Sequence, residues 1–233
     1  MPTIHLPTGE KGGVGKTFLT RTMIQYAIDR KFPFTAVETD RSNPDVAGVY
    51  KDICKYAIFS EDEKQLDKAD SIFEYAIEKS VIVSLPSQVH RAVSNWIDRN
   101  ELFKIGEQYK VDFCNWFVCN GRFDSVKLLI ASLNHYQNRM PHILVRNWGM
   151  CDDWSQVEQD QDLQKLIKKY KVKTIDFPKL EYKEAYLIDK NRLNFAEAKK
   201  HKDFTVLGKQ RVVNFLDSAY STFDSTGVWD ESI

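Results

Sequence analysis

The chain has 233 residues, 42% of them hydrophobic, and its 33 Lys and Arg residues equal its 33 Asp and Glu residues in number. This length suits one domain with a sizeable core. The net charge of zero excludes binding to nucleic acid or a membrane through overall charge, so such a partner would need a local patch.

The four cysteines, Cys54, Cys114, Cys119 and Cys151, show neither CxxC nor CxxH spacing, and no signal-peptide hydrophobic region precedes them. We therefore expect reduced thiols in a cytoplasmic protein. No apolar run approaches the ~18 residues that a membrane span needs.

Short apolar segments alternate with longer amphipathic ones along the chain. The short segments have the composition of strands buried on both faces: Thr3–Leu6, Phe34–Glu38, Ser80–Leu85, Asn115–Cys119, His142–Val145 and Thr174–Phe177. Helical patterns cover Lys16–Arg30, Pro44–Ala57, Glu61–Lys79, Val89–Tyr109, Ser125–Asn138, Trp154–Tyr170, Lys179–Asp189, Phe195–Lys202 and Gly208–Phe223. The alternation predicts an α/β fold, a mostly parallel sheet with helices on both faces. We expect one domain over residues 1–233, with a helical C-terminal part from about residue 179.

A glycine-rich stretch, EKGGVGKTF from Glu10 to Phe18, lies where the first strand should turn into the first helix. Glycines allow the backbone to bend so that successive N–H groups point at a phosphate, and the helix adds its positive N-terminal end. Lys16 matches the lysine that reaches the β and γ phosphates, and the Thr17 hydroxyl matches the magnesium ligand. The stretch therefore predicts a phosphate-binding loop.

The run from Lys11 to Thr17 resembles the deviant Walker A box, KGGxGK[ST], of the ParA/MinD family of P-loop ATPases. The resemblance implies a three-layer P-loop NTPase fold that binds ATP and Mg²⁺. It makes Lys11 the lysine that crosses a dimer interface to the partner's nucleotide, although a solvated loop charge is the alternative. The implied nucleotide-binding residues are Gly12, Gly13, Val14, Gly15, Lys16, Thr17 and Phe18.

Two carboxylates follow the second predicted strand in the stretch from Val37 to Asp45. By resemblance to the family's first switch, Glu38 matches the first carboxylate and Asp40 the one that orients the attacking water near the magnesium ion. A carboxylate beside the γ-phosphate can position or deprotonate water. The alternative is that Asp40 caps the following helix.

The third predicted strand continues into VIVSLPSQ, from Val81 to Gln88. It resembles the family's Walker B strand and second switch, but Ser84 stands where the family has aspartate. A serine hydroxyl can hold a magnesium-bound water but lacks the charge that favours the metal, so we expect slow hydrolysis. A strand exit turned by Pro86 is the alternative interpretation of this stretch.

The fifth predicted strand runs into Asn147, which matches the family's adenine-reading asparagine. An amide offers adenine a paired donor and acceptor, but an asparagine that forms a turn before Gly149 explains the residue almost as well. Pro178, at the end of the sixth strand, matches a segment that packs on the base in relatives. Asp124 or Ser125 is expected to cap the helix that follows the fourth strand.

Charge is uneven along the chain. Residues 165–211 hold 14 Lys and Arg against 6 Asp and Glu, an excess of eight. ParA-like ATPases bind DNA without sequence preference through basic residues near the C-terminal part, so this segment supplies candidates, although helices with lysines on their solvated faces are the alternative. The candidates are Lys168, Lys169, Lys199, Lys200, Lys202, Lys209 and Arg211. The acidic end after Asp217 argues against a membrane-binding helix of the MinD type.

The sequence thus predicts a slowly hydrolysing ATPase that forms an ATP-dependent homodimer and acts in plasmid partition or plasmid mobilisation. Expected partners are non-specific DNA, with nucleoid association, and a small protein that stimulates hydrolysis, but no membrane. A nucleotide-gated binding module with little hydrolysis is one alternative. The other, a metabolic ATP-dependent enzyme of the same fold, needs a second substrate pocket for which the sequence offers no motif.

Overall fold

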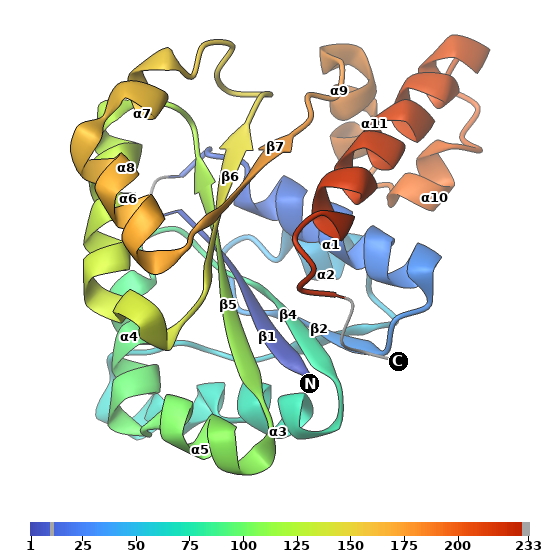
Figure 1. The fold of residues 1–233 in the computed structure, drawn as a ribbon. Helices are drawn as coiled ribbons and strands as arrows, with labels where there is room; N and C mark the ends of the chain where they lie inside the picture. Colours follow the sequence, from blue (N-terminus) through green and yellow to red (C-terminus); the bar gives the residue numbers. More distant parts are fainter. Residues whose placement is uncertain (10–11, 230–233) are drawn as a thin grey trace.

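The computed structural model describes residues 1–9 and 12–229. Its centre is a sheet of seven parallel strands in the order β3-β2-β4-β1-β5-β6-β7 (Figure 1). The strands are β1 (Thr3–Thr8), β2 (Phe34–Glu38), β3 (Cys54–Tyr56), β4 (Ser80–Ser84), β5 (Asp112–Cys119), β6 (His142–Asn147) and β7 (Lys173–Phe177). Because all strands run the same way, their carboxyl ends meet at one edge of the sheet, where the loops that follow β1, β2 and β4 lie side by side.

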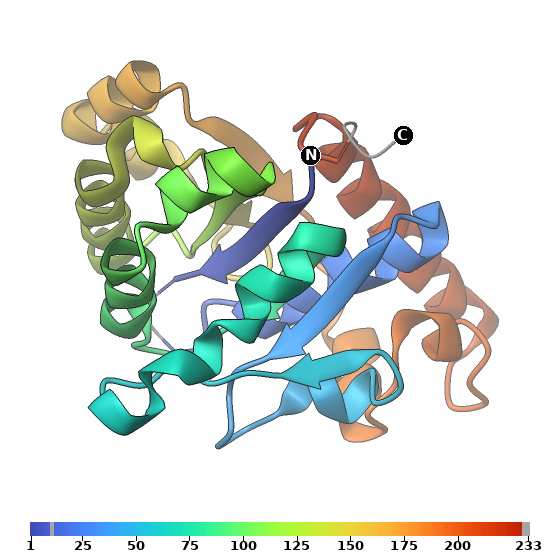
Figure 2. The ribbon, with the colours of Figure 1, turned by 90° about the horizontal axis from the view of Figure 1, so that it is seen from below.

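Helices cover both faces of the sheet (Figures 1 and 2). One face carries α1 (Lys16–Arg30), α2 (Asp45–Val49), α9 (Tyr182–Lys190), α10 (Phe195–Ala198) and α11 (Val206–Asp224). The other carries α3 (Ser71–Glu78), α4 (His90–Arg99), α5 (Leu102–Tyr109), α6 (Phe123–Tyr136), α7 (Ser155–Gln159) and α8 (Gln161–Tyr170), with the 3₁₀ helices η1 (Glu63–Ala69) and η2 (Gln137–Arg139). The expected α/β three-layer fold is confirmed. No helix in the described part of the chain is long and apolar enough to cross a membrane.

The continuous apolar composition of the central strands follows from this burial on both faces. Ile82 of β4 belongs to the core cluster under α1, whereas its neighbours Val81 and Val83 belong to the cluster under α3. Successive side chains of a strand point to opposite faces, so a strand covered on both sides needs apolar residues at every position.

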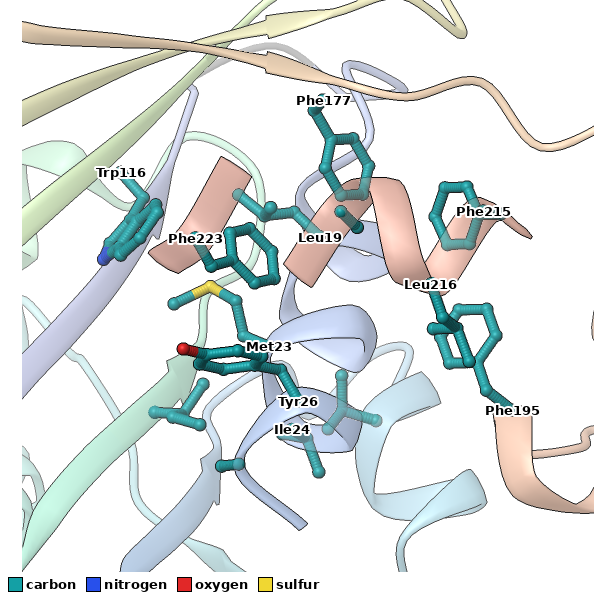
Figure 3. Packing of buried hydrophobic residues seen from close by; sticks show 14 of the residues in the cluster. Leu19, Met23, Ile24, Tyr26, Trp116, Phe177, Phe195, Phe215, Leu216 and Phe223 are labelled. Carbon is teal, nitrogen blue, oxygen red and sulfur yellow. The ribbon is translucent and has the colours of Figure 1, made fainter. Parts of the chain in front are cut away.

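The packing between α1 and α11 holds the C-terminal part of the chain against the sheet (Figure 3). Leu19 and Met23 of α1 and Phe223 of α11 are fully buried, and Phe223 packs edge-on against Tyr26 with 5.4 Å between ring centroids. Full burial of side chains of this size contributes about 1.5–3 kcal/mol each relative to exposure. The first helix is therefore fixed in place by the last one.

Several predicted helices differ from the structure. The helix predicted over Glu61–Lys79 divides into η1 and α3, and the helix predicted over Trp154–Tyr170 divides into α7 and α8. The segment predicted as one helix from Pro44 to Ala57 contains the five-residue α2 and then the edge strand β3, whose exposed Tyr56 gives no apolar alternation to recognise. The segment predicted as one helix from Val89 to Tyr109 breaks at Glu101, where φ is +48°. The helix expected to be capped by Asp124 or Ser125 begins earlier, at Phe123, and no side chain caps it.

Two histidines are buried in the sheet. His5 of β1 stacks on Trp229 with 4.1 Å between ring centroids, and burial lowers its pKa to about 3. His142 of β6 lies within hydrogen-bonding distance of Ser132 and the Met140 carbonyl, and burial lowers its pKa to about 4. Both imidazoles are therefore neutral in the folded state at pH values where an unfolded histidine binds a proton.

This burial predicts a loss of stability in mild acid. Each histidine has a lower pKa folded than unfolded, so the stability that it contributes is present above its unfolded pKa of about 6.5 and is lost as pH falls. The free energy of unfolding should fall by about 1.4 kcal/mol per pH unit for each histidine between about pH 6 and pH 4. Urea unfolding at pH 7, 6 and 5 measures the slope, and His142→Gln should reduce it. An unchanged slope in that variant would show that this histidine does not cause the acid sensitivity.

Candidate functional site

The glycine loop joins β1, at the centre of the sheet, to α1. Gly13 has φ +78° and Gly15 has φ +101°, in the region that favours glycine, and Gly15 is the residue from which α1 starts. No side chain caps this helix start in the described part of the chain. The loop and the N-terminal end of α1 therefore have the geometry of an anion-binding site.

Lys16 ties this loop to the loop that follows β4. Its side chain is buried, and its Nζ donates hydrogen bonds to the Gly9 carbonyl at 2.7 Å and to the Ser87 hydroxyl at 3.5 Å. The sequence predicts that Lys16 binds phosphate and that Ser87 belongs to the second switch, and the structure brings these two residues together. Lys11, the predicted dimer-crossing lysine, lies outside the described residues.

A cavity of about 830 Å³ opens beside the loop. Six residues predicted to bind nucleotide or to act on it line it, namely Gly13, Gly15, Lys16, Thr17, Phe18 and Asp40. Five charged residues without an earlier assignment also line it, namely Arg21, Asp45, Lys51, Asp189 and Arg192. The spacing of Thr17 and Arg21, four residues apart in α1, is the signal that would have indicated Arg21, because residues at i and i+4 share a helix face. Nothing in the sequence indicates that Asp189 and Arg192 lie nearby.

Glu38, rather than Asp40, caps the helix after the first switch. Glu38 is buried, and its Oε2 accepts from the backbone N–H groups of Val46 and Ala47 in α2 at 3.1 and 3.3 Å. Its Oε1 accepts from the N–H groups of Thr39 and Asp40, both at 3.0 Å. Burial raises the pKa of Glu38, and the hydrogen bonds from the Asp40, Val46 and Ala47 amides and from Ser84 offset part of the rise.

Asp40 lies on the cavity wall, and its Oδ1 accepts from the backbone N–H groups of Ser42 and Asn43, both at 3.0 Å. These bonds hold residues 40–43 in a tight turn and fix the direction of the carboxylate. The water-orienting role of Asp40 stays a prediction. The alternative, that Asp40 caps the following helix, does not hold, because Glu38 caps it.

Ser84 lies beside the cavity without lining it. It is buried opposite Glu38 in the β2–β4 pairing, and the Ser84 hydroxyl hydrogen-bonds Glu38. The two remaining predicted magnesium ligands, Thr17 and Asp40, both line the cavity. Mg²⁺ is usually bound through one or two protein oxygens together with phosphate and water oxygens, and this pair fits such an ion. In the described residues no group of three or more His, Cys, Asp or Glu side chains is placed to hold a metal by itself.

Asn147, at the end of β6, hydrogen-bonds to the glycine loop. Its Nδ2 donates to the Val14 carbonyl at 2.8 Å, and its Oδ1 accepts from the Gly149 N–H at 3.0 Å. Both ends of the amide are thus bonded within the protein, and the residue does not line the cavity. The predicted base-contacting Pro178 and the loop residues Gly12 and Val14 do not line it either.

The contact between Gly15 and Asn147 predicts a sharp effect of Gly15→Ala. A Cβ on Gly15 would lie 2.3 Å from Asn147 Nδ2, and φ is unfavourable for any L side chain. We expect the free energy of unfolding to fall by about 2 kcal/mol or more, from backbone strain and the displaced amide.

The control for this substitution is Gly48→Ala in α2, where a Cβ would meet nothing within 4 Å. This variant should be neutral or more stable by about 0.5–1 kcal/mol. Urea unfolding measures both variants. Equal free energies of unfolding in the two would contradict a loop that depends on this contact.

The basic residues of segment 165–211 divide between two sides of the molecule. Lys168 and Lys169 belong to α8, on the left of Figure 1, whereas Lys199 follows α10 and Lys209 belongs to α11, both on the right. Figure 2 shows the same separation. Lys199 also lies 3.9 Å from Asp29, and Arg211 lies 2.8 Å from buried Glu184. The excess of charge in the sequence therefore does not form one continuous patch.

A glycine loop after the central strand, a parallel sheet and helices on both faces are features that this chain shares with the fold of MinD. The cell division protein MinD of Aquifex aeolicus matches this chain with a TM-score of 0.53 and 12% identity, covering 93% of this chain and 96% of that one. A chain of the MinC:MinD cell division protein complex of the same organism gives a TM-score of 0.52 and 12% identity, covering 93% of this chain and 94% of that one.

In sequence, the chain is similar to protein MobD of Acidithiobacillus ferrooxidans, with 27% identity over 151 residues. The match covers 62% of this chain and 63% of MobD, so it spans less than two thirds of that relative. No protein-family model matches the chain. The two MinD structures show that the chain has the fold of MinD.

Proposed function

We propose that the protein binds ATP with Mg²⁺ at the glycine loop and hydrolyses it slowly. The observation that carries the proposal is the placement of Lys16, Thr17 and Asp40 around one cavity at the N-terminal end of α1. The helix end and Lys16 supply positive charge for the β and γ phosphates, and Thr17 and Asp40 supply oxygens for the magnesium ion. Mg²⁺ neutralises charge on the phosphates when it is bound.

Slow hydrolysis follows from the carboxylates near the cavity. Phosphoryl transfer to water needs a group that orients the water and enough positive charge to stabilise the transition state. Asp40 is one of three carboxylates on the cavity wall, with Asp45 and Asp189, and it is the one at the predicted water-orienting position, whereas Glu38 caps α2. Ser84 adds no charge at the position where a second acidic group would hold the metal.

ATP binding is proposed to close two copies of the chain face to face, with Lys11 of each reaching the nucleotide of the other. The resemblance of the sequence from Lys11 to Thr17 to the deviant Walker A box supports this part of the proposal. Hydrolysis or nucleotide release would then separate the copies. A small partner protein that stimulates hydrolysis would regulate this cycle.

The biological setting that we propose is plasmid mobilisation, with plasmid partition as the second candidate. The 27% identity to MobD favours mobilisation, and the MinD-like fold is compatible with either setting. A second cavity, of about 290 Å³, is relevant to the metabolic alternative. Lys16 also lines this cavity, together with residues of β1, β5, α4 and α6, and its lining is mostly apolar. An enzyme acting on a small substrate would need such a pocket, so purified protein should be tested for ATP turnover without added substrate.

Substitutions at Lys16 and Asp40 test the core of the proposal. Lys16→Ala should abolish measurable ATP binding, because it removes the buried cation at the loop. Asp40→Asn keeps an oxygen to accept the Ser42 and Asn43 amides, so it should bind ATP within about threefold of the wild type but lose most phosphate release. Equilibrium binding of a fluorescent ATP analogue and a phosphate-release assay measure the two effects.

Lys104→Ala, which changes an exposed side chain of α5 far from the glycine loop in the sequence, is the matched control and should behave as the wild type. Light scattering with and without ATP then tests the dimer. If wild type and Asp40→Asn both bind ATP and both stay monomeric, the dimer proposal fails while nucleotide binding stands. If Asp40→Asn releases phosphate at the wild-type rate, Asp40 does not orient the water.

Replacing lysines by uncharged residues tests the proposed binding to DNA. We propose that the group near α10, Lys199, Lys200 and Lys202, contacts phosphates without sequence preference. Changing all three to Gln should lower the affinity for duplex DNA at least tenfold at ~50 mM salt and reduce the salt dependence. Lys168→Gln with Lys169→Gln on α8 is the control. The assignment would be contradicted by an equal loss of DNA affinity in both variants. It would also be contradicted if the DNA affinity of the wild type were the same at ~50 mM and ~200 mM salt.

A further inference from the structure

The second cavity, of about 290 Å³, lies on the face of the sheet opposite α1, between β1, β5, α4 and α6. Six of the side chains that line it are aliphatic or aromatic and at most 5% exposed, namely Leu6, Leu85, Val93, Phe117, Tyr136 and Met140. Protein interiors are close-packed, and an apolar space of this size holds water poorly. The cavity therefore suits an apolar molecule.

Lys16 connects this second cavity to the first one, the cavity of about 830 Å³ beside the glycine loop. Lys16 lines both cavities. Its Nζ donates to the carbonyl of Gly9, which lines the second cavity, and to the hydroxyl of Ser87, which lines the first. The ammonium therefore lies at the boundary between the two spaces.

The charge around the second cavity has one sign. Lys16 is positive, and among the described residues no Asp or Glu side chain lines this space. His90 also lines it, and a histidine adds either no charge or a positive one. Apolar pockets with a few polar groups are typical of sites that bind small organic molecules. These features together suit a molecule with an apolar body and one acidic group.

A short segment after β4 belongs to the walls of both cavities. Leu85 lines both of them, Ser87 lines the first and Gln88 lines the second. Gln88 has φ +60°, which is uncommon for a residue other than glycine, so its surroundings have to hold it in this conformation. A molecule in either cavity therefore contacts the same segment, next to the same lysine.

Hydrogen bonds fix the walls of the second cavity relative to one another. The Tyr136 hydroxyl of α6 lies 2.9 Å from Ser94 Oγ of α4, and Asn115 Nδ2 of β5 donates to Ser132 Oγ of α6 at 3.2 Å. Tyr136 and Asn115 both line the cavity. A site with fixed walls loses little conformational freedom when it binds a ligand, which favours binding.

We propose that the second cavity binds a small amphipathic anion. The apolar part of this molecule packs against Leu6, Phe117 and Met140, and its acidic group lies towards Lys16. Because the phosphates of ATP also need Lys16, the anion and ATP weaken each other's binding. This last part rests on the proposed binding of ATP at the glycine loop. The second cavity is then a regulatory site for a small organic acid.

The coupling between the two ligands is electrostatic. A lysine ammonium is a compact positive charge on a flexible stem, so a phosphate in the first cavity draws it away from the second. Two anions beside one cation also repel each other. Thermodynamic linkage requires each ligand to weaken the other by the same factor, and we expect a factor of about ten.

Octanoate and octanol test the recognition of the acidic group, because they have the same chain length and only octanoate is charged. Displacement of anilinonaphthalene sulfonate, a fluorescent amphipathic anion, measures the affinity of both. The wild type should bind octanoate at least about fivefold more tightly than octanol. Lys16→Ala should lose this preference.

Ala131→Phe tests the place of binding. Ala131 is an exposed residue of α6 that lines the cavity, so a phenyl ring there narrows the cavity without disturbing the core. This variant should bind octanoate at least about tenfold more weakly and bind ATP as the wild type does. Asn134→Phe is the matched control, because it puts the same ring at an exposed position of α6 that does not line the cavity. It should bind both ligands as the wild type does.

Titration with both ligands tests the coupling. Saturating ATP with Mg²⁺ should weaken octanoate binding to the wild type about tenfold, and saturating octanoate should weaken ATP binding by the same factor. In Ala131→Phe, octanoate should leave the affinity for ATP unchanged.

The inference is overturned if the wild type binds no octanoate or binds octanol as tightly, or if Ala131→Phe binds octanoate as tightly as Asn134→Phe does. It is also overturned if ATP binds and leaves the affinity for octanoate unchanged. The proposed function fails separately, when the wild type binds no ATP. Octanoate binding by the wild type and by Ala131→Phe then still decides whether the second cavity is a binding site.

Discussion

The turn from β1 into α1 is the constraint on which the rest of the site depends. Gly13 and Gly15 adopt positive φ angles there, and the Asn147 amide packs against the turn so closely that Gly15 has no room for a side chain. Lys16 then reaches back to the Gly9 carbonyl across the loop. Because α1 starts directly from this turn, the shape of the loop also sets the position of every side chain that α1 presents to the cavity.

The site combines rigid supports with exposed charged groups. Glu38, Asn147 and Arg21 are buried, and each is bonded to backbone atoms of a neighbouring element. Asp40 and Asp189 present carboxylates to the cavity, each with one oxygen held in place. Groups fixed in this way lose little freedom when a ligand binds, which favours selective recognition. These supports thus give the cavity a defined shape.

The sequence was most informative where function depends on local geometry. The glycine spacing before Lys16 predicted the loop, and apolar runs predicted six of the strands, because both patterns follow from neighbouring residues. It was less informative for Glu38, whose capping of α2 needs a contact across eight and nine positions. It gave no indication of Asp189, which meets Arg21 across 168 positions. The edge strand β3 was missed because an edge strand with exposed side chains lacks the apolar run of a buried one.

The pairing of β1 bears on how the chain folds during synthesis. This first strand hydrogen-bonds only to later strands, with Ile4 opposite Val81 and Thr3 opposite Asp112, and its His5 stacks on Trp229. β1 is therefore synthesised before the strands that it pairs with. The glycine loop after β1 has no complete sheet next to it until about half of the chain has been synthesised. Until then the unpaired apolar strand β1 can pair with strands of other nascent chains. A chaperone that binds this segment would prevent such mispairing of the central strand.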